Sequence, residues 1–141
     1  MNTYPLTILT PEHSFYEDEA ESFVFDSPDG QICVLHNHAP FVSVIEPCIA
    51  IIKDRDGNSK KAFLADGFVE ITADGDCNVF TQSAEWPDKI DREHAMKSVE
   101  KAKKKLAEHK LSDPFMTKFD NLHLLRATER LKAVDEKKEN K

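Results

Sequence analysis

The fold class is decided by the stretch DGFVEITADGDCNVFTQ, residues 66–82. Apolar and polar residues alternate over 69–72 and again over 77–82, which is the period-2 pattern of half-buried strands. Asp74-Gly75 lies between the two runs, and Asp-Gly is typical of a type I′ hairpin turn because both residues tolerate a positive φ. The stretch therefore predicts two antiparallel strands joined by a tight turn.

The same signals recur on the N-terminal side of this stretch. Every glycine of the chain follows an aspartate, and further alternating runs surround Leu6 and Phe23. All 4 glycines and 6 of the 7 prolines lie in residues 1–87. Short strands with turns at this density predict a β-sandwich or barrel.

The composition changes after Trp86-Pro87. Residues 1–87 contain 4 Lys and Arg against 15 Asp and Glu, whereas residues 88–141 contain 15 against 11. The net charges are therefore −11 and +4, within a chain of 141 residues whose net charge is −7. We predict two domains, 1–87 and 88–141, with different secondary structure and opposite charge.

The second segment has the pattern of two helices. Asp88 or Asp91 can cap a first helix over about 90–110, and Ser112-Asp113-Pro114 can end it and start a second. Each helix carries a predicted apolar stripe: Ala95, Val99, Ala102 and Leu106 in the first, and Phe115, Phe119, Leu122, Leu124, Ala127, Leu131 and Val134 in the second. A short connection between them predicts an antiparallel helical hairpin.

Several classes of protein are disfavoured. No apolar run approaches the roughly 18–20 residues that span a bilayer, and the N-terminus lacks the basic and apolar regions of a signal peptide. The acidic first segment would repel phosphate, so we expect no nucleic-acid binding. Cys33, Cys48 and Cys77 are odd in number and form no CxxC, which predicts mostly buried, reduced thiols.

The residues alone predict no active site. His36 and His38 could share one face of a strand and hold a metal, but no third ligand lies at a diagnostic spacing. No nucleophile motif or phosphate-binding glycine loop occurs. The basic first helix is either a solvated face or a docking surface for an acidic partner. A binding or regulatory protein is therefore favoured over an enzyme.

Four segments in order resemble a known family. Residues 6–12 are similar to its first strand and turn, and residues 29–40, DGQICVLHNHAP, follow its pattern of a glycine, an apolar dipeptide and His-Ala-Pro. Residues 67–71 are similar to its second signature, and Ala84-Glu85 before Ile90-Asp91 to its domain junction. Over essentially its whole length, the chain resembles the epsilon subunits of bacterial F-type, proton-translocating ATP synthases.

The resemblance implies an α+β fold, in which a flattened antiparallel β-sandwich of about ten strands precedes a two-helix hairpin. It implies a central-stalk subunit that couples proton translocation to rotary ATP synthesis. The sandwich would bind the gamma subunit and the c-ring, and the protein would lie peripherally on the cytoplasmic side of the bacterial cell membrane without inserting into it. The residues implied at this interface are Gly30, Gln31, His38, Ala39 and Pro40.

The resemblance also implies a movable hairpin. In an extended state it would reach acidic segments of the catalytic beta subunits and inhibit ATP hydrolysis. The positive charge needed for that contact is carried by the stripe containing Lys97, Lys101, Lys104 and Lys105. Catalysis would belong to the alpha and beta subunits. We therefore expect no catalytic residue, no metal and no resident cofactor in this chain.

Some bacterial members of this family bind ATP in the compact state. The matching positions are Ile90, Asp91 and Ala95 in the first helix and Arg126 and Arg130 in the second, with Glu85 as a further candidate. His94 stands where the family pattern has arginine, and a neutral imidazole offers one donor where guanidinium offers a charged fork. We expect ATP to be a weak regulatory ligand at most.

Two other interpretations stay open. The chain could be a stand-alone ATP-sensing module that uses its hairpin as a nucleotide clamp, or Arg126 and Arg130 could be a solvated pair one helical turn apart.

Three further departures from the family pattern lie in the first segment. Gln31 stands where the family often has glutamate, and Cys33 and Asn37 stand where glycine is common. Asn37 can keep a turn because asparagine tolerates a positive φ, whereas Cys33 requires ordinary β geometry.

Overall fold

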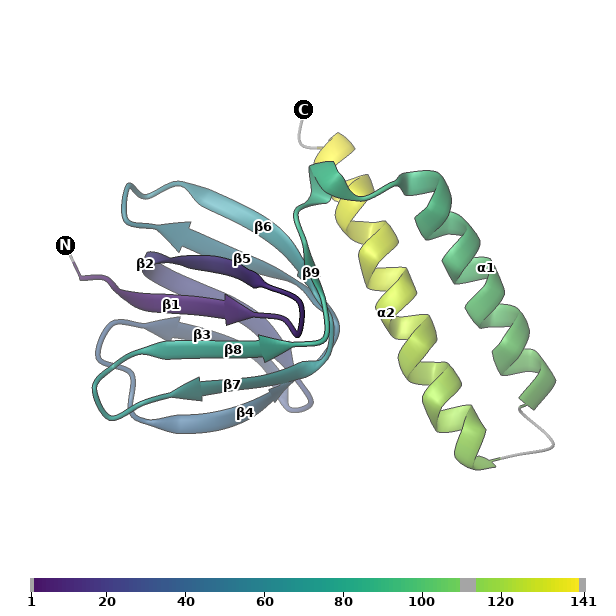
Figure 1. The fold of residues 1–141 in the computed structure, drawn as a ribbon, viewed down its shortest axis with the longest axis horizontal. Helices are drawn as coiled ribbons and strands as arrows, with labels where there is room; N and C mark the ends of the chain where they lie inside the picture. Colours follow the sequence, from purple (N-terminus) through teal and green to yellow (C-terminus); the bar gives the residue numbers. More distant parts are fainter. Residues whose placement is uncertain (1, 110–113, 140–141) are drawn as a thin grey trace. The chain divides into compact units, whose positions relative to one another are not determined.

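The computed structural model describes the backbone of residues 2–109 and 114–139 (Figure 1). The chain divides into two compact units, the β unit (Met1–Trp86) and the helical unit (Pro87–Lys141). The predicted boundary between residues 87 and 88 lies one residue later. Each unit is described by itself below.

The described part of the β unit contains nine strands in one hydrogen-bonded order, β4-β7-β8-β1-β2-β5-β6-β9, with β3 paired to β2. They are β1 (Tyr4–Leu9), β2 (Ser14–Ser27), β3 (Gly30–Leu35), β4 (Phe41–Ile45), β5 (Cys48–Asp54), β6 (Ser59–Leu64), β7 (Gly67–Ile71), β8 (Cys77–Thr81) and β9 (Ala84–Glu85). The ladder between β1 and β8 is parallel, and their arrows point the same way in Figure 1.

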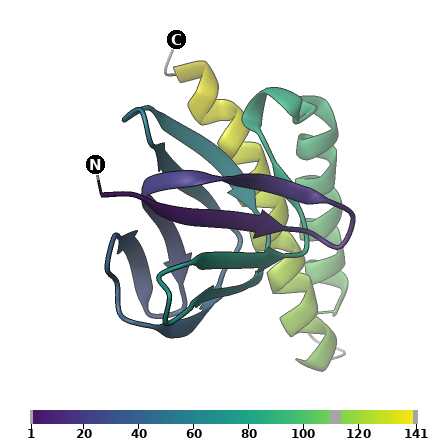
Figure 2. The same ribbon diagram turned by 60° about the vertical axis from the view of Figure 1, so that its left-hand side comes forward.

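The long strand β2 belongs to both layers of the sandwich (Figure 2). Its first half pairs with β1, and its second half pairs with β3 on one side and β5 on the other. The register shifts between Ala20 and Ser22, where the strand passes from one layer to the other. The predicted α+β fold, with a β-sandwich followed by two helices, is confirmed.

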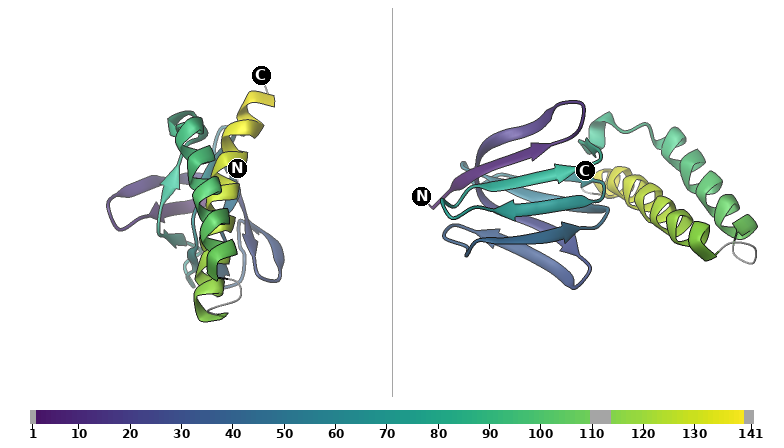
Figure 3. Two further views of the ribbon diagram at one scale, coloured as in Figure 1. Left: turned by 90° about the vertical axis from the view of Figure 1, so that its right-hand side faces the viewer. Right: turned by 60° about the horizontal axis from the view of Figure 1, so that its bottom comes forward.

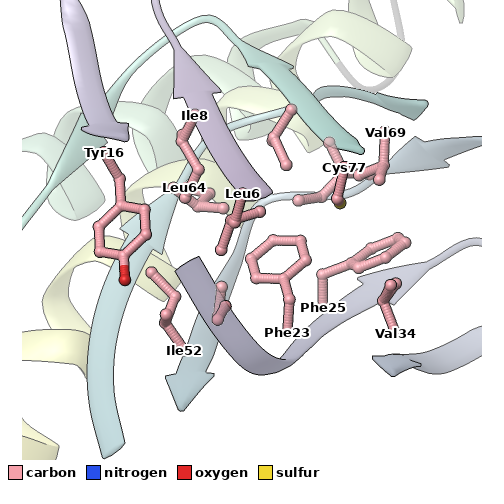
Figure 4. Close-up of a cluster of buried hydrophobic side chains, with 14 of the residues drawn as sticks. Leu6, Ile8, Tyr16, Phe23, Phe25, Val34, Ile52, Leu64, Val69 and Cys77 are labelled. Carbon is pink, nitrogen blue, oxygen red and sulfur yellow. The ribbon is translucent and has the colours of Figure 1, made fainter. Parts of the chain in front are cut away.

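The core consists of the inward residues of these alternating strands. Phe23 and Phe25 are fully buried and their ring centroids lie 5.5 Å apart. In the close-up of Figure 4, Phe23 lies beside Leu6 and Phe25 lies beside Val34. Burying a side chain of this size contributes about 1.5–3 kcal/mol. The hydroxyl of Tyr4 donates to the Val34 carbonyl over 2.7 Å, and burial raises the pKa of Tyr4.

The predicted type I′ turns are wrong. Among the described residues, Asn37 (φ 67°) is the only one other than glycine with a positive φ, so no aspartate adopts the required conformation. Instead, the Gly57 amide donates to the Asp54 carbonyl, and the Asp54 amide donates to the Asn58 carbonyl. This three-residue loop, with its glycine in the left-handed region, recurs between Thr72 and Asp76.

Gly67 does not serve a turn at all, because it opens strand β7 without a positive φ. A Cβ atom at this position would lie 1.8 Å from the carbonyl oxygen of Phe80. Glycine is therefore required here by the close approach of β8.

The cysteines differ from one another. Cys48 and Cys77 are buried as predicted, and burial raises the pKa of the Cys77 thiol to about 12. Cys33 is exposed, so the prediction of a buried thiol is wrong at this position. Its neighbour Val34 points into the core, and successive residues of a strand point to opposite faces. The predicted ordinary strand geometry at Cys33 and positive φ at Asn37 are both confirmed.

The helical unit begins with a short 3-10 helix, η1 (Pro87–Lys89), followed by α1 (Arg92–His109) and α2 (Pro114–Glu139). Asp91 caps α1, as its carboxylate accepts a hydrogen bond from the His94 amide over 3.2 Å. Asp88, the other cap candidate, lies in η1. The predicted breaker at Ser112-Asp113 lies outside the described residues.

The two helices pack side by side and antiparallel (Figure 3). On the α1 side of the seam, Ala95, Val99 and Ala102 are buried as predicted. In α2 the prediction fails at Phe119, which is 47% exposed, because its neighbour Asp120 occupies the seam position instead. Consecutive helical residues point about 100° apart, so both cannot face α1. The side chain of Phe115 lies outside the described residues.

Candidate functional site

The segment joining β3 and β4 is held by its own contacts. The His38 amide donates to the Leu35 carbonyl over 3.1 Å, and Nδ1 of the His38 ring lies 2.9 Å from the Ala39 carbonyl oxygen. The His38 and Phe41 rings contact one another in a tilted arrangement, with centroids 4.7 Å apart. Of the predicted interface residues, Gly30 and Gln31 at the start of β3 and Ala39 and Pro40 after its end are exposed, and His38 is half-buried. They belong to one continuous stretch from the start of β3 to the start of β4.

A row of outward-facing apolar side chains crosses four strands of the β unit, and sequence reasoning missed it. Val44 pairs with Phe68, Phe68 with Phe80, and Phe80 with Leu9, so the row runs over β4, β7, β8 and β1. Paired residues share one face of a sheet. We call these four side chains the apolar row.

The apolar row is open to solvent at its β4 end. Val44 is 56% exposed and Phe68 is 46% exposed, while the rings of Phe68 and Phe80 stack with centroids 4.9 Å apart. The signal in the sequence was present: the outward positions of these alternating strands hold Val and Phe where a solvated face carries polar residues.

A hollow of about 380 Å³ adjoins the apolar row. Phe68 and Phe80 form part of its wall, together with Pro11, Gly67 and Gln82. The hollow therefore extends the exposed apolar surface toward the end of β1.

The acidic surface of β2 is partly neutralised by basic residues of β5 and the turn after it. Arg55 lies 2.8 Å from Asp18, and Lys53 lies 3.4 Å from Glu21. The backbone amide of Glu19 and the guanidinium of Arg55 lower the pKa of Asp18. Within the part of the chain that the structure describes, no three His, Cys, Asp or Glu side chains gather where they could hold a metal.

The residues predicted to bind a nucleotide are divided between the two units. Glu85 belongs to β9 of the β unit. In the helical unit, Ala95 and Ile90 are buried and the Asp91 carboxylate caps α1. Arg126 precedes Arg130 by one helical turn, and both are half-buried.

Arg130 and His94 contact one another across the hairpin. A guanidinium nitrogen of Arg130 lies 3.2 Å from Nδ1 of His94. Guanidinium only donates hydrogen bonds, so Nδ1 of His94 is placed to accept in this contact. Beside it, Arg92 donates to Asp135 over 2.8 Å, an ion pair that sequence reasoning missed.

The predicted docking lysines of α1 are exposed. Lys97, Lys101 and Lys104 project from the side of α1 opposite its buried alanines, and Lys105 is exposed beside them. Lys97 pairs with Glu93 over 3.6 Å, and both side chains are largely in solvent. We call these four lysines the basic face. Neither described helix is long and apolar enough to cross a membrane.

Comparison with known proteins identifies relatives of both units. The family model described as "ATP synthase, Delta/Epsilon chain, beta-sandwich domain" matches residues 3–87. The ATP synthase epsilon chain of Caldanaerobacter subterraneus subsp. tengcongensis is 33% identical over 137 residues, which is 97% of each chain. That of Caldicellulosiruptor bescii is 34% identical over 139 residues, or 99% of this chain and 98% of that one.

Two solved structures have a similar fold. A chain of the Euglena gracilis mitochondrial ATP synthase (OSCP/F1/c-ring) matches with a TM-score of 0.78 at 18% identity, over 95% of this chain and 82% of that one. A chain of the central stalk and c-ring of the Tetrahymena thermophila mitochondrial ATP synthase matches with a TM-score of 0.57 at 15% identity, over 93% and 96%.

Proposed function

Because the chain belongs to the ATP synthase delta/epsilon chain family, we propose that it is the epsilon subunit of an ATP synthase central stalk and holds no catalytic residue. The observation that carries this proposal is the similarity to epsilon chains over nearly the whole length of both units. In this role the protein rotates with the stalk and helps couple proton translocation to ATP synthesis. The catalytic work belongs to the alpha and beta subunits.

The β unit is the part that binds the stalk. The apolar row exposes Val44 and Phe68 side by side, and neighbouring exposed apolar side chains mark contact surfaces rather than solvated ones. We assign this face to the gamma subunit. The segment from Gly30 and Gln31 to His38, Ala39 and Pro40 is assigned to the polar loops of the c-ring.

These protein contacts would hold the subunit at the cytoplasmic side of the bacterial cell membrane. The attachment is peripheral, because it depends on gamma and the c-ring rather than on insertion into lipid.

The helical unit is the regulatory part. The basic face of α1 is exposed and lies opposite the seam, so it can meet acidic segments of the catalytic beta subunits without disturbing the hairpin. Docking there inhibits ATP hydrolysis. The contact is electrostatic and exposed, so it is reversible and weakens with salt.

ATP is at most a weak ligand of this hairpin. Arg130 contacts His94, and the Asp91 carboxylate caps α1, so both groups already have partners within the helical unit. Calorimetry with Mg²⁺ and ATP tests this point, with Arg126→Ala as the control. Tight binding abolished by Arg126→Ala would instead support a stand-alone ATP sensor.

The main experiment uses the purified full chain with the gamma subunit and the catalytic complex of its own synthase. We expect the chain to co-purify with gamma and to lower the rate of ATP hydrolysis. If it neither binds gamma nor changes hydrolysis, the proposed function is wrong.

A further inference from the structure

The hairpin is joined by polar contacts at both ends, and the two ends differ in burial. The loop end comprises the last turn of α1 and the first described turns of α2, with His109, Thr117 and Asp120. The junction end comprises the first turn of α1 and the facing part of α2, with Arg92 and Asp135.

At the loop end, Nδ1 of His109 lies 2.6 Å from the carboxylate of Asp120. The Asp120 side chain is only 4% exposed, so it has little access to water. A buried carboxylate is costly without a partner, which makes Asp120 dependent on the His109 ring.

α2 holds His109 at a second atom as well. The Thr117 hydroxyl donates to the His109 backbone carbonyl over 3.3 Å. Thr117 and Asp120 are three residues apart on one face of α2, so they hold the carbonyl and the ring of the same residue. The last turn of α1 is thereby fixed along the axis of α2.

At the junction end, the polar interhelical contacts are exposed. Arg92 and Asp135 are each 42% exposed, and the contact between Arg130 and His94 is also exposed. Exposed pairs contribute little net stability because water competes for both partners. Along the first turns of α1, the seam is made by Ala95 and Val99, which bury little area.

We infer that the hairpin is locked at its loop end by His109 and Asp120, and that it opens from its junction end. This sequence of opening stands independently of the proposed function. Its consequence, that junction-end release frees α2 for inhibition, rests on the proposed function.

Hydrogen exchange of the full-length chain, measured residue by residue, tests the lock with two matched variants. Asp120→Ala and Asp135→Ala each remove one carboxylate of α2 from an interhelical contact. We expect Asp135→Ala to speed exchange less than about threefold, and only in the first turn of α1 and the facing turns of α2. We expect Asp120→Ala to speed exchange at least tenfold along all of α1. Equal effects of the two variants would overturn the inference.

Two further variants keep the test decisive if Asp120→Ala unfolds the helical unit. In a His109→Ala background, Asp120→Ala is expected to add less than a twofold further change, because the lock is already lost. His109→Leu combined with Asp120→Leu is expected to restore protection, since an apolar pair of similar volume can replace a buried polar pair. Additive single effects, or no restoration, would contradict a specific lock.

ATP hydrolysis separates this inference from the proposed function. Asp135→Ala is expected to increase inhibition of the catalytic complex about twofold. If exchange follows the predicted pattern but inhibition does not change, the lock stands and the proposed regulatory role is wrong. If the exchange pattern fails while the chain still inhibits hydrolysis, the lock is wrong and the role stands.

Discussion

The β unit and the helical unit are stabilised by different kinds of contact. Among the described residues, the largest fully buried side chains all lie in the β unit, with Phe23, Phe25 and Phe63 first among them. The helical seam instead buries Ala95, Val99 and Ala102 of α1, and polar pairs join the two helices at both ends of the seam. A closely packed aromatic core resists partial opening, whereas a seam of small residues can separate in steps.

This difference matches the two roles that we propose. A unit fixed to a rotating stalk must keep its structure under load. A regulatory helical unit must be able to change conformation at a modest cost in free energy. The following changes are ways to break or sharpen the comparison, from the largest expected effect to the smallest.

Truncation of the core should affect the β unit most. Phe23→Ala removes a fully buried ring, and we expect it to lower the free energy of unfolding by about 3–5 kcal/mol. Urea unfolding followed by the single tryptophan, Trp86, measures this, because that ring stacks on Phe15 with centroids 4.5 Å apart. Phe119→Ala in the helical unit is the exposed control and should cost less than about 1 kcal/mol. Similar losses for both would remove the contrast between the units.

Thiol labelling compares the inside and the surface of the β unit. Burial raises the pKa of Cys77 to about 12, so only about one thiol in ten thousand is ionised at pH 8. Cys33 is exposed and should react with a maleimide at least about a hundredfold faster. Mass spectrometry of partially labelled protein checks this. Rapid labelling of native Cys77 would show that the β unit opens readily.

Binding of the gamma subunit probes the apolar row. Phe68→Ser should weaken binding by about 2 kcal/mol, or roughly thirtyfold, because the ring lies centrally in the row. Its effect on the stability of the β unit should be small, since the ring is half exposed. Glu70→Gln, on the same strand and face, is the polar control. Unchanged binding by Phe68→Ser would place the gamma contact elsewhere.

Charge reversal on the basic face should have the smallest effect. Lys101→Glu should weaken inhibition of ATP hydrolysis about fivefold, or roughly 1 kcal/mol, and the loss should shrink at high salt. Lys60→Glu in the β unit changes the net charge equally and is the control. Equal loss of inhibition in both variants would mean that net charge alone, rather than the basic face, determines docking.

Local sequence signals predicted the local features of the fold. Alternation over 69–72 and 77–82 identified β7 and β8, and the cap at Asp91 followed from the helix pattern. The predicted turn type was wrong because glycine alone adopts a positive φ in these three-residue loops. The parallel pairing of β1 with β8 could not be predicted, since it joins segments about seventy residues apart whose local patterns carry no information on their partner.

The candidate sites show the same limit. The apolar row depends on which strands are neighbours, so Phe68 and Val44 were recognisable as outward residues only after the strand order was known. His109 and Asp120 were missed because an apolar stripe was assumed along the whole seam. A polar residue in such a stripe is informative only when its partner is known.

The division of labour between the units is tested most directly by a fragment comprising residues 1–87. Gamma binding and inhibition of ATP hydrolysis are measured for this fragment and for the full chain under the same conditions. We predict that the fragment binds gamma with the affinity of the full chain and does not inhibit hydrolysis. A fragment that fails to bind gamma while remaining folded, or one that inhibits as strongly as the full chain, would contradict the account.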